Sequence, residues 1–347
     1  MHYYICSAFS FLMVITFVPL IIKLSIRYHV FDRNDLANGP RISRLGGIAM
    51  FLSFFSSICL LIYLRGEYQA YFTLTPLILL FLVGLYDDLF NLAALLKLSF
   101  QLLVAFLATV YWEIVPFNNL INSPFWNPIF CNLLSIIFIV FMINAFNLID
   151  GIDGLATMQG IVVIMFISFG LLLYGDFQYA GSGFIFCSAL TGFLFYNISP
   201  AKIYLGDSGS MITGFIAVML SCRLLALGHE MSGFVPGNKV YVLALFMVPL
   251  YDALRVVLVR LLNRQSPFKR DQNHVHHRLR LLGWSDVHIV MALSSYTIIM
   301  VLITFAFQGI NESLQMFILL LISVLINMAL TFKLQTGATG VRINRNI

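Results

Sequence analysis

Charged residues are scarce in this chain. Asp, Glu, Lys and Arg make up 10% of its 347 residues, whereas soluble domains carry about a quarter. Hydrophobic residues make up 60%, and the mean hydropathy is +0.93. This composition excludes an ordinary soluble domain and predicts a polytopic integral membrane protein embedded in a lipid bilayer.

Cysteine is also sparse and has no disulfide or metal-binding spacing. The five cysteines stand singly in apolar segments and form no Cys-x-x-Cys pair, so disulfide and zinc-ribbon interpretations have no support. No folded basic module is present, which argues against a nucleic-acid partner. The net charge of +5 is explained by loop lysines and arginines, which attract anionic lipid.

The N-terminus lacks the features of a cleavable signal peptide. No basic stretch precedes the apolar run 5–22, and the cations Lys23 and Arg27 come after it. No small-x-small cleavage site follows. This order predicts an uncleaved first helix with its N-terminus outside.

The long apolar runs predict an all-α bundle, because irregular backbone within lipid would leave its polar groups unsatisfied. We expect one transmembrane catalytic domain over residues 1–347. Hydropathy indicates eleven spans, at roughly 4–26, 46–64, 71–87, 98–115, 130–148, 155–174, 180–197, 209–227, 239–260, 288–307 and 313–333.

The distribution of Lys and Arg favours one orientation of this bundle. With the N-terminus outside, 17 of the 20 Lys and Arg residues lie in inner loops or at inner helix ends. Only Arg65, Arg223 and Lys239 lie toward the outside. By the positive-inside rule, the C-terminus is then cytoplasmic. Four polar clusters that interrupt the apolar runs all fall on this inner face.

The first cluster is Asp87 and Asp88, which end the third predicted span. A pair of interfacial charges that only stops the helix is one interpretation. Adjacent carboxylates repel, however, and in a partly desolvated groove they favour holding a proton or a divalent cation. Successive helical residues point about 100° apart. One carboxylate can therefore face the bundle while the other faces the membrane surface.

The second cluster contains Asn147, Asp150 and Asp153, with Gly151 and Gly154 between them. Asn147 and Asp150 share a helix face if the helix continues that far. A simple turn followed by an N-cap is the alternative. Two aspartates, an asparagine and two glycines within eight residues exceed what one cap needs, which indicates a site.

The third cluster is Asp207 in Gly-Asp-Ser-Gly-Ser, ten residues after Asn197. An N-cap is again the simpler interpretation, worth about 1 kcal/mol. A glycine-flanked carboxylate at the positive end of a helix also suits a hard cation with phosphate oxygens close by.

The fourth cluster is His274, His276 and His277 in the longest inner loop, together with Arg278. A solvated basic loop that touches anionic headgroups is one interpretation, and a zinc site is another. No cysteine is near, and the surrounding cations would repel a metal. Phosphate is the better ligand for such a charge distribution. Together, the four clusters predict metal-assisted phosphate chemistry on a lipid at the inner membrane surface.

The order of these motifs resembles a known family. Asp-Asp, Asn-x-x-Asp-Gly-x-Asp-Gly-Leu-Ala, Asn-(x)9-Gly-Asp-x-Gly-Ser and His-x-His-His-Arg-Leu follow one another as in the polyprenyl-phosphate N-acetylhexosamine-1-phosphate transferases, of glycosyltransferase family 4 type. The resemblance covers about residues 31–285. The His-x-His-His spacing looks like the branch that uses UDP-N-acetylglucosamine (UDP-GlcNAc), because the related muramoyl-pentapeptide branch has three consecutive histidines and ten spans.

The resemblance implies a reaction and its partners. Undecaprenyl phosphate attacks the β-phosphate of a UDP-N-acetylhexosamine, giving undecaprenyl-diphospho-sugar and UMP, with Mg²⁺ as cofactor and Mn²⁺ as its substitute. The location implied is the bacterial inner membrane, with the site on the cytoplasmic face. A homodimer stays open as the assembly.

The resemblance also implies roles for the motif residues. Asp207 is the expected metal ligand, Asp87 the general base, and Asp88 a metal or orientation partner. The remaining assignments are Lys97 as a catalytic cation, His276 and His277 at the diphosphate, and Asn147, Asp150, Asp153, Asn197, His274 and Arg278 at the substrate. One departure concerns the lysine that the muramoyl-pentapeptide branch carries before its Pro-x-x-Gly-Gly stretch. It has no clear equivalent here, where Arg41 and Arg44 are the nearest cations and have no assigned role.

Two other classes fit the clusters less well. A transporter would place its aspartates and histidines near the bilayer midplane, and here they lie at inner helix ends. A CDP-alcohol phosphotransferase needs Asp-Gly-x-x-Ala-Arg, but Thr157 follows Ala156. The identity of the N-acetylhexosamine and of the glycan stays open, since one contact can decide between sugars.

Overall fold

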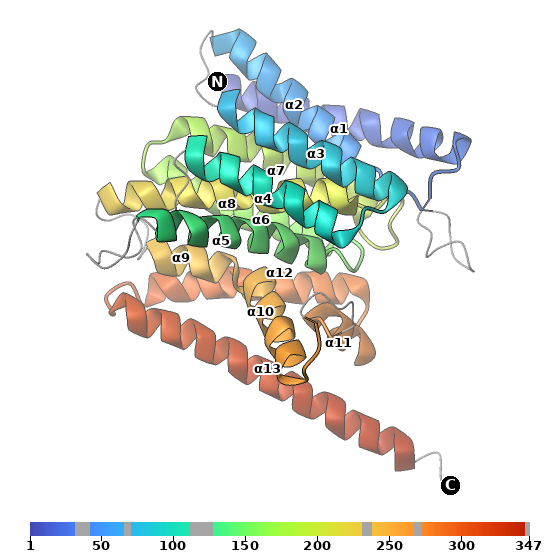
Figure 1. The fold of residues 1–347 in the computed structure, drawn as a ribbon, viewed down its shortest axis with the longest axis vertical. Coiled ribbons are helices and arrows are strands. Elements are labelled where there is room, and N and C mark those ends of the chain that lie inside the picture. The colour runs from blue at the N-terminus through green and yellow to red at the C-terminus, as the bar shows by residue number, and fades with distance from the viewer. Residues whose placement is uncertain (32–41, 66–70, 112–127, 231–237, 267–272, 344–347) are drawn as a thin grey trace. The chain divides into compact units, whose positions relative to one another are not determined.

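The computed structural model describes residues 1–31, 42–65, 71–111, 128–230, 238–266 and 273–343 (Figure 1). Thirteen helices account for the regular structure of these residues. The chain forms two compact units, unit 1 over Met1–Val235 and unit 2 over Pro236–Ile347. Each is described by itself below, and the expectation of one catalytic domain stays a prediction.

Unit 1 is a bundle of eight helices, with α8 at its centre. The helices are α1 (His2–Arg27), α2 (Gly46–Arg65), α3 (Tyr71–Phe90), α4 (Ala94–Tyr111), α5 (Pro128–Ile149), α6 (Leu155–Leu173), α7 (Phe177–Asn197) and α8 (Gly206–Glu230). Helix α8 packs against α2, α3, α5, α6 and α7. An apolar helix that is buried on nearly all sides belongs in the centre of a bundle.

Small residues bring the start of α8 close to α2 and α3. A Cβ atom on Gly84 of α3 would lie 2.4 Å from the Cα atom of Ser208, and one on Gly47 of α2 would lie 2.3 Å from its Oγ. Only glycine allows such an approach, as is common where helices pack in membranes. Because Gly84 lies one turn before Asp87 and Asp88, this contact carries both carboxylates to the beginning of α8.

Unit 2 contains a bent pair of helices, two further long helices and one short helix. They are α9 (Asn238–Leu245), α10 (Met247–Leu262), α11 (Val275–Leu281), α12 (Asp286–Ala306) and α13 (Glu312–Ile343). Helices α9 and α10 meet at 74°, so the span expected at 239–260 is broken. Pro249 has no N–H for the carbonyl of Leu245, which is the local reason for a break at this point.

The membrane-protein fold is confirmed, with a smaller number of spans than expected. Among the described residues, eight helices are long and apolar enough to cross a membrane, and nine if the bent pair is one span. Helix α3 is not among them, and α4 counts as a shorter apolar helix over Ala94–Val110. Part of the span expected at 98–115 lies outside the described residues. The external N-terminus stays a prediction.

Candidate active site

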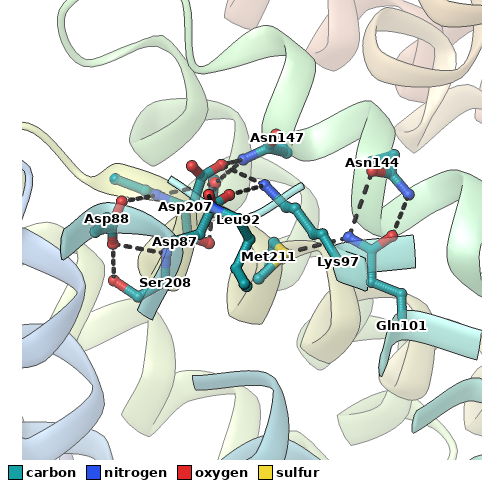
Figure 2. Close-up of polar contacts among 12 residues, drawn as sticks. Asp87, Asp88, Leu92, Lys97, Gln101, Asn144, Asn147, Asp207, Ser208 and Met211 are labelled. Carbon is teal, nitrogen blue, oxygen red and sulfur yellow. Dashed lines mark hydrogen bonds and ion pairs between the residues drawn. The ribbon is translucent and has the colours of Figure 1, made fainter. Parts of the chain in front are cut away.

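Lys97 of α4 lies between two aspartates that are far apart in sequence. Its Nζ donates to Asp87 Oδ2 at 2.9 Å and to Asp207 Oδ1 at 2.7 Å (Figure 2). The Lys97 side chain is 13% exposed, so both contacts are partly shielded from solvent and their attraction exceeds that of a surface pair. Asp87 Oδ1 also accepts from the N–H of Leu92 at 2.7 Å. The ends of α3, α4 and α8 therefore meet at one ammonium group.

Asp88 points to different partners and caps α8. Its carboxylate accepts from the N–H of Asp207 at 2.7 Å, the N–H of Ser208 at 3.0 Å and Ser208 Oγ at 2.6 Å. A carboxylate at this position satisfies free N–H groups and interacts favourably with the positive helix end. Asp88 thus fixes the position of Asp207, and both of its oxygens are used in doing so.

Helix α5 contributes an amide to the same cluster. Asn147 Nδ2 donates to Asp207 Oδ1 and, at 2.9 Å, to Ser210 Oγ. Asp150 follows three residues later, after the helix has ended, and is half-buried. Burial, followed by the nearby charges of Asp207 and Asp88, raises the pKa of the Asp150 carboxyl to about 8. Its surroundings therefore favour the neutral form of Asp150 more than water does.

Asp153 and Asn197 hold the loop between α7 and α8. Asp153 Oδ2 accepts from the N–H of Ala201 at 2.9 Å. The buried Asn197 amide accepts from Thr157 Oγ1 at 2.6 Å and donates to the carbonyl of Ile203 at 3.0 Å. Both side chains form hydrogen bonds within the protein, and these bonds hold the loop that leads to Asp207. Direct contact of either residue with a substrate stays a prediction.

The segment before α2 lies beside the same loop. Ser43 and Ile203 form an isolated parallel bridge. Gly206 has φ +75°, and a Cβ there would lie 2.2 Å from the carbonyl oxygen of Arg44. The backbone of Arg44 is therefore packed against the start of α8. Arg41 lies outside the described residues.

The donor set of this cluster fits a magnesium ion that is held together with a substrate. Mg²⁺ is commonly bound by one or two carboxylates, with phosphate oxygens and water completing its shell. Asp207 and Asp87 supply hard oxygen atoms on adjacent helix ends. Over the described part of the chain, no group of three or more His, Cys, Asp or Glu side chains is arranged to hold a metal by itself.

The histidine segment, residues 274–278, is held by α10 in unit 2. Asp252 Oδ2 lies 2.9 Å from His274 Nδ1, and Asp252 Oδ1 accepts from the N–H of Val275 at 3.0 Å. Arg255 Nη2 donates to Asp252 Oδ1 at 3.0 Å and also to the carbonyl of Asn273. The Asp252–Arg255 pair thus fixes the start of α11 from both sides.

His276 is the most enclosed member of the histidine segment. Its side chain is fully buried, with ring centroids 5.8 Å from His274 and 4.2 Å from His277. Neither of its ring nitrogens has a hydrogen-bond partner in the described structure. Burial, and then the charge of His277, lowers the pKa of His276 to about 3, so the ring is neutral at pH 7. Contact of His276 and His277 with a diphosphate stays a prediction.

The protein is a multi-pass membrane protein with an acidic site at its helix ends, which we call the Lys97 cluster. Its members are Asp87, Asp88, Lys97, Asn147, Asp207, Ser208 and Ser210. The sequence profile described as glycosyl transferase family 4 matches residues 70–225, a stretch that includes every polar residue of the cluster. The chain belongs to this family and is thus an enzyme of the polyprenyl-phosphate sugar-1-phosphate transferase class.

Three relatives illustrate the range of similarity. The probable undecaprenyl-phosphate N-acetylglucosaminyl 1-phosphate transferase of Bacillus subtilis (strain 168) is 28% identical over 292 residues, covering 82% of this chain and 79% of that protein. The decaprenyl-phosphate N-acetylglucosaminephosphotransferase of Mycobacterium tuberculosis (strain CDC 1551 / Oshkosh) is 31% identical over 278 residues, covering 72% and 68%. The phospho-N-acetylmuramoyl-pentapeptide-transferase of Clostridium botulinum (strain Eklund 17B / Type B) is 28% identical over 320 residues, covering 86% and 93%.

Several polar residues of these two regions are absent from the sequence-based expectations. Ser208 and Ser210 contact the carboxylate or amide groups of the cluster, and Asp252 holds the histidine segment. Asp252 and Arg255 stand within an apolar span, and ionisable residues in such a position are a functional signal in themselves. That signal could have identified the pair without a structure.

Proposed function

We propose that this enzyme transfers an N-acetylhexosamine 1-phosphate, with GlcNAc 1-phosphate favoured, from its UDP-sugar to undecaprenyl phosphate. The products are undecaprenyl-diphospho-sugar and UMP. The observation that carries the proposal is the Lys97 bridge between Asp87 and Asp207, with Asn147 on the same Asp207 oxygen. The printed names of the Bacillus and Mycobacterium relatives support the choice of sugar.

The proposed chemistry is a single displacement at the β-phosphorus. An oxygen of the lipid phosphate forms the new P–O bond, and the bond to the UMP oxygen breaks. Asp87 would accept the proton of the lipid phosphate, if one is present, and UMP would leave as the phosphate anion. Lys97 holds the two carboxylates in place and would stabilise charge that develops on the phosphate oxygens.

Magnesium, or manganese in its place, is proposed as the cofactor. When bound, the ion would neutralise the diphosphate and polarise its β-phosphorus. Asp207 would hold it, with Asp87 near by. Asp88 was expected as a metal or orientation partner, and we propose the orientation role, because its two oxygens accept three hydrogen bonds from the start of α8. We also propose that His276 and His277 contact the diphosphate. Only the order of the sequence motifs supports this role.

The decisive experiment is UMP release by the purified enzyme in detergent. Undecaprenyl phosphate would be combined in turn with UDP-GlcNAc, UDP-GalNAc and UDP-glucose, with and without Mg²⁺. We expect UMP only when lipid phosphate, a UDP-N-acetylhexosamine and Mg²⁺ are all present. Absence of UMP from every combination, with a protein that is folded, would contradict the proposal. Uptake of a solute by vesicles that contain the protein would instead support a transporter.

The cytoplasmic position of the site is proposed from the positive-inside bias. Single cysteines at Asn118 and Asn273, in a background without the five native cysteines, would test it in intact cells. An impermeant thiol reagent should label only the cysteine at 118. Labelling of the cysteine at 273 from outside would reverse the proposed orientation.

A further inference from the structure

The last helix, α13, has a polar stripe on an otherwise apolar surface. Buried or half-buried polar residues recur on it at spacings of four or eight, on one helix face. The members are Gln315, Ser323, Asn327 and Thr331. Their neighbours Leu325, Ile326 and Met328 are 55%, 50% and 60% exposed. The stripe therefore faces the interior of unit 2, while the rest of the helix is available to lipid.

Two residues of this stripe hold Arg278 of the histidine segment. Arg278 Nη1 donates to Asn327 Oδ1 at 2.5 Å, and Nη2 donates to Thr331 Oγ1 at 2.5 Å. Thr331 Oγ1 in turn donates to the carbonyl of Asn327 at 2.8 Å. Arg278 is 6% exposed, so its guanidinium has little freedom once these two bonds form.

Both partners of the guanidinium are neutral. No carboxylate in the described part of the chain forms an ion pair with Arg278, whereas the neighbouring Arg255 is paired with Asp252. A carboxylate partner would orient the guanidinium and also cancel its charge. An amide and a hydroxyl orient the guanidinium without forming an ion pair with it, so that it can still pair with an anion. The guanidinium has five N–H donors, of which these two contacts use two.

We propose that Asn327 and Thr331 are positioning residues, which hold Arg278 in place for a phosphate group of the nucleotide sugar. This inference rests on the proposed function. It extends the working part of the enzyme to α13, which lies beyond both the family match at residues 70–225 and the motifs at 31–285. A purely structural role for the stripe is the competing explanation.

The test compares two near-isosteric variants with a control on the same stripe. Asn327→Leu and Thr331→Val remove the acceptors of Arg278 while keeping volume. Ser323→Ala removes a different contact, the 2.6 Å bond to the Tyr296 hydroxyl. Each variant would be measured for kcat, KM for UDP-GlcNAc, equilibrium binding of UDP-GlcNAc and thermal unfolding in detergent. Thr331→Ser keeps the hydroxyl and serves as the conservative variant.

We expect Asn327→Leu and Thr331→Val each to weaken UDP-GlcNAc binding and raise KM by about tenfold, the value of one hydrogen bond to a charged group. Ser323→Ala and Thr331→Ser should keep the wild-type KM. Unchanged binding and KM in the first two variants would overturn the inference. So would losses that merely follow the fraction of folded protein, or an equal rise in KM for Ser323→Ala.

Equilibrium binding of UDP-GlcNAc, measured apart from UMP release, distinguishes failure of this inference from failure of the proposed function. If the wild-type enzyme binds UDP-GlcNAc but releases no UMP, the proposed reaction fails, and the affinities of the two variants still decide the role of the stripe. If the wild-type protein neither binds nor turns over any UDP-sugar, both proposals fail.

Discussion

Lys97 Nζ and Asp207 Oδ1 are 2.7 Å apart, although 110 positions separate the two residues in the chain. The same ammonium contacts Asp87, and the same carboxylate oxygen accepts from Asn147. Three helix ends are thereby tied to the start of α8. The charges of Lys97, Asp87 and Asp207 therefore also hold the helix ends in position. Substitution of these residues can test this dependence.

Replacing Lys97 with Met should leave two carboxylates close together without their shared cation. We expect kcat to fall by roughly ten- to a hundredfold for each charge-assisted hydrogen bond lost, because each is worth about 1.5–3 kcal/mol.

Asp207→Asn should abolish turnover while the protein level stays near that of the wild type, since it changes charge and little volume. Both variants would be assayed by UMP release over a range of Mg²⁺ concentrations. Near-normal turnover of Asp207→Asn at ordinary Mg²⁺ would rule out its role as the metal ligand.

Asp88→Ala should affect folding as well as activity. The substitution removes three hydrogen bonds to the start of α8, and loss of an N-cap alone costs about 0.5–2 kcal/mol. We expect a lower unfolding temperature than for Asp87→Ala, which loses the Leu92 and Lys97 contacts but leaves the cap intact. Thermal unfolding in detergent measures the difference. If the two variants unfold at the same temperature, the cap is not the main function of Asp88.

A pair of amides, the buried Gln101 and the half-buried Asn144, lies one turn from the Lys97 cluster. Gln101 is four residues after Lys97 on α4, and Asn144 is three residues before Asn147 on α5. Asn144 Nδ2 donates to Gln101 Oε1 at 2.7 Å, and Gln101 Nε2 lies 3.4 Å from Asn144 Oδ1 (Figure 2). The pair thus fixes the register of the two helices that present Lys97 and Asn147 to Asp207.

Replacing one amide of this pair should lower the unfolding free energy more than replacing both. Gln101→Leu leaves Asn144 Oδ1 without its partner, while Asn144 Nδ2 keeps its 2.8 Å bond to the carbonyl of Val140. A buried polar atom that is left unsatisfied costs about 1–3 kcal/mol. The double variant Gln101→Leu/Asn144→Leu leaves no unpaired amide. We therefore expect its unfolding free energy to exceed that of Gln101→Leu, with non-additive effects in a double-mutant cycle. Strictly additive losses would show that the two amides act independently.

The sequence was sufficient to predict the all-helical membrane fold, because apolar runs are local signals. It also singled out Asp87, Asn147 and Asp207, which the structure brings together at Lys97, and their roles stay predictions. The direction of each side chain was not predictable in the same way. Asp88 and Asn197 belong to family motifs, yet Asp88 caps α8 and Asn197 holds a loop. The Asp88 partners lie 119 and 120 positions away, and Thr157 lies 40 positions from Asn197. Only packing therefore determines which aspartate meets Lys97. The break between α9 and α10 was missed because hydropathy continues through it.

His276 gives a pH-dependent prediction with a definite sign. Its pKa is lowered from the ordinary value of 6.5 to about 3 by burial and by His277. Between these values the unfolded chain binds a proton that the folded protein does not, so stability should be lost as pH falls from about 6.5 toward 3. Above pH 6.5 both states have a neutral ring, and no dependence on His276 is expected.

The matching experiment compares the wild-type enzyme with His276→Phe across this range. Phenylalanine has a similar flat ring and no titrating nitrogen, so the difference in unfolding temperature between the two proteins should favour the variant increasingly from pH 6.5 to pH 4.5. If His276 also contacts the diphosphate, turnover of His276→Phe at pH 7.5 should fall by about tenfold or more, from the loss of one hydrogen bond to a charged group. An unfolding-temperature difference that is constant with pH would show that His276 is accessible to protons in the folded enzyme. Wild-type turnover would leave His276 with a packing role only.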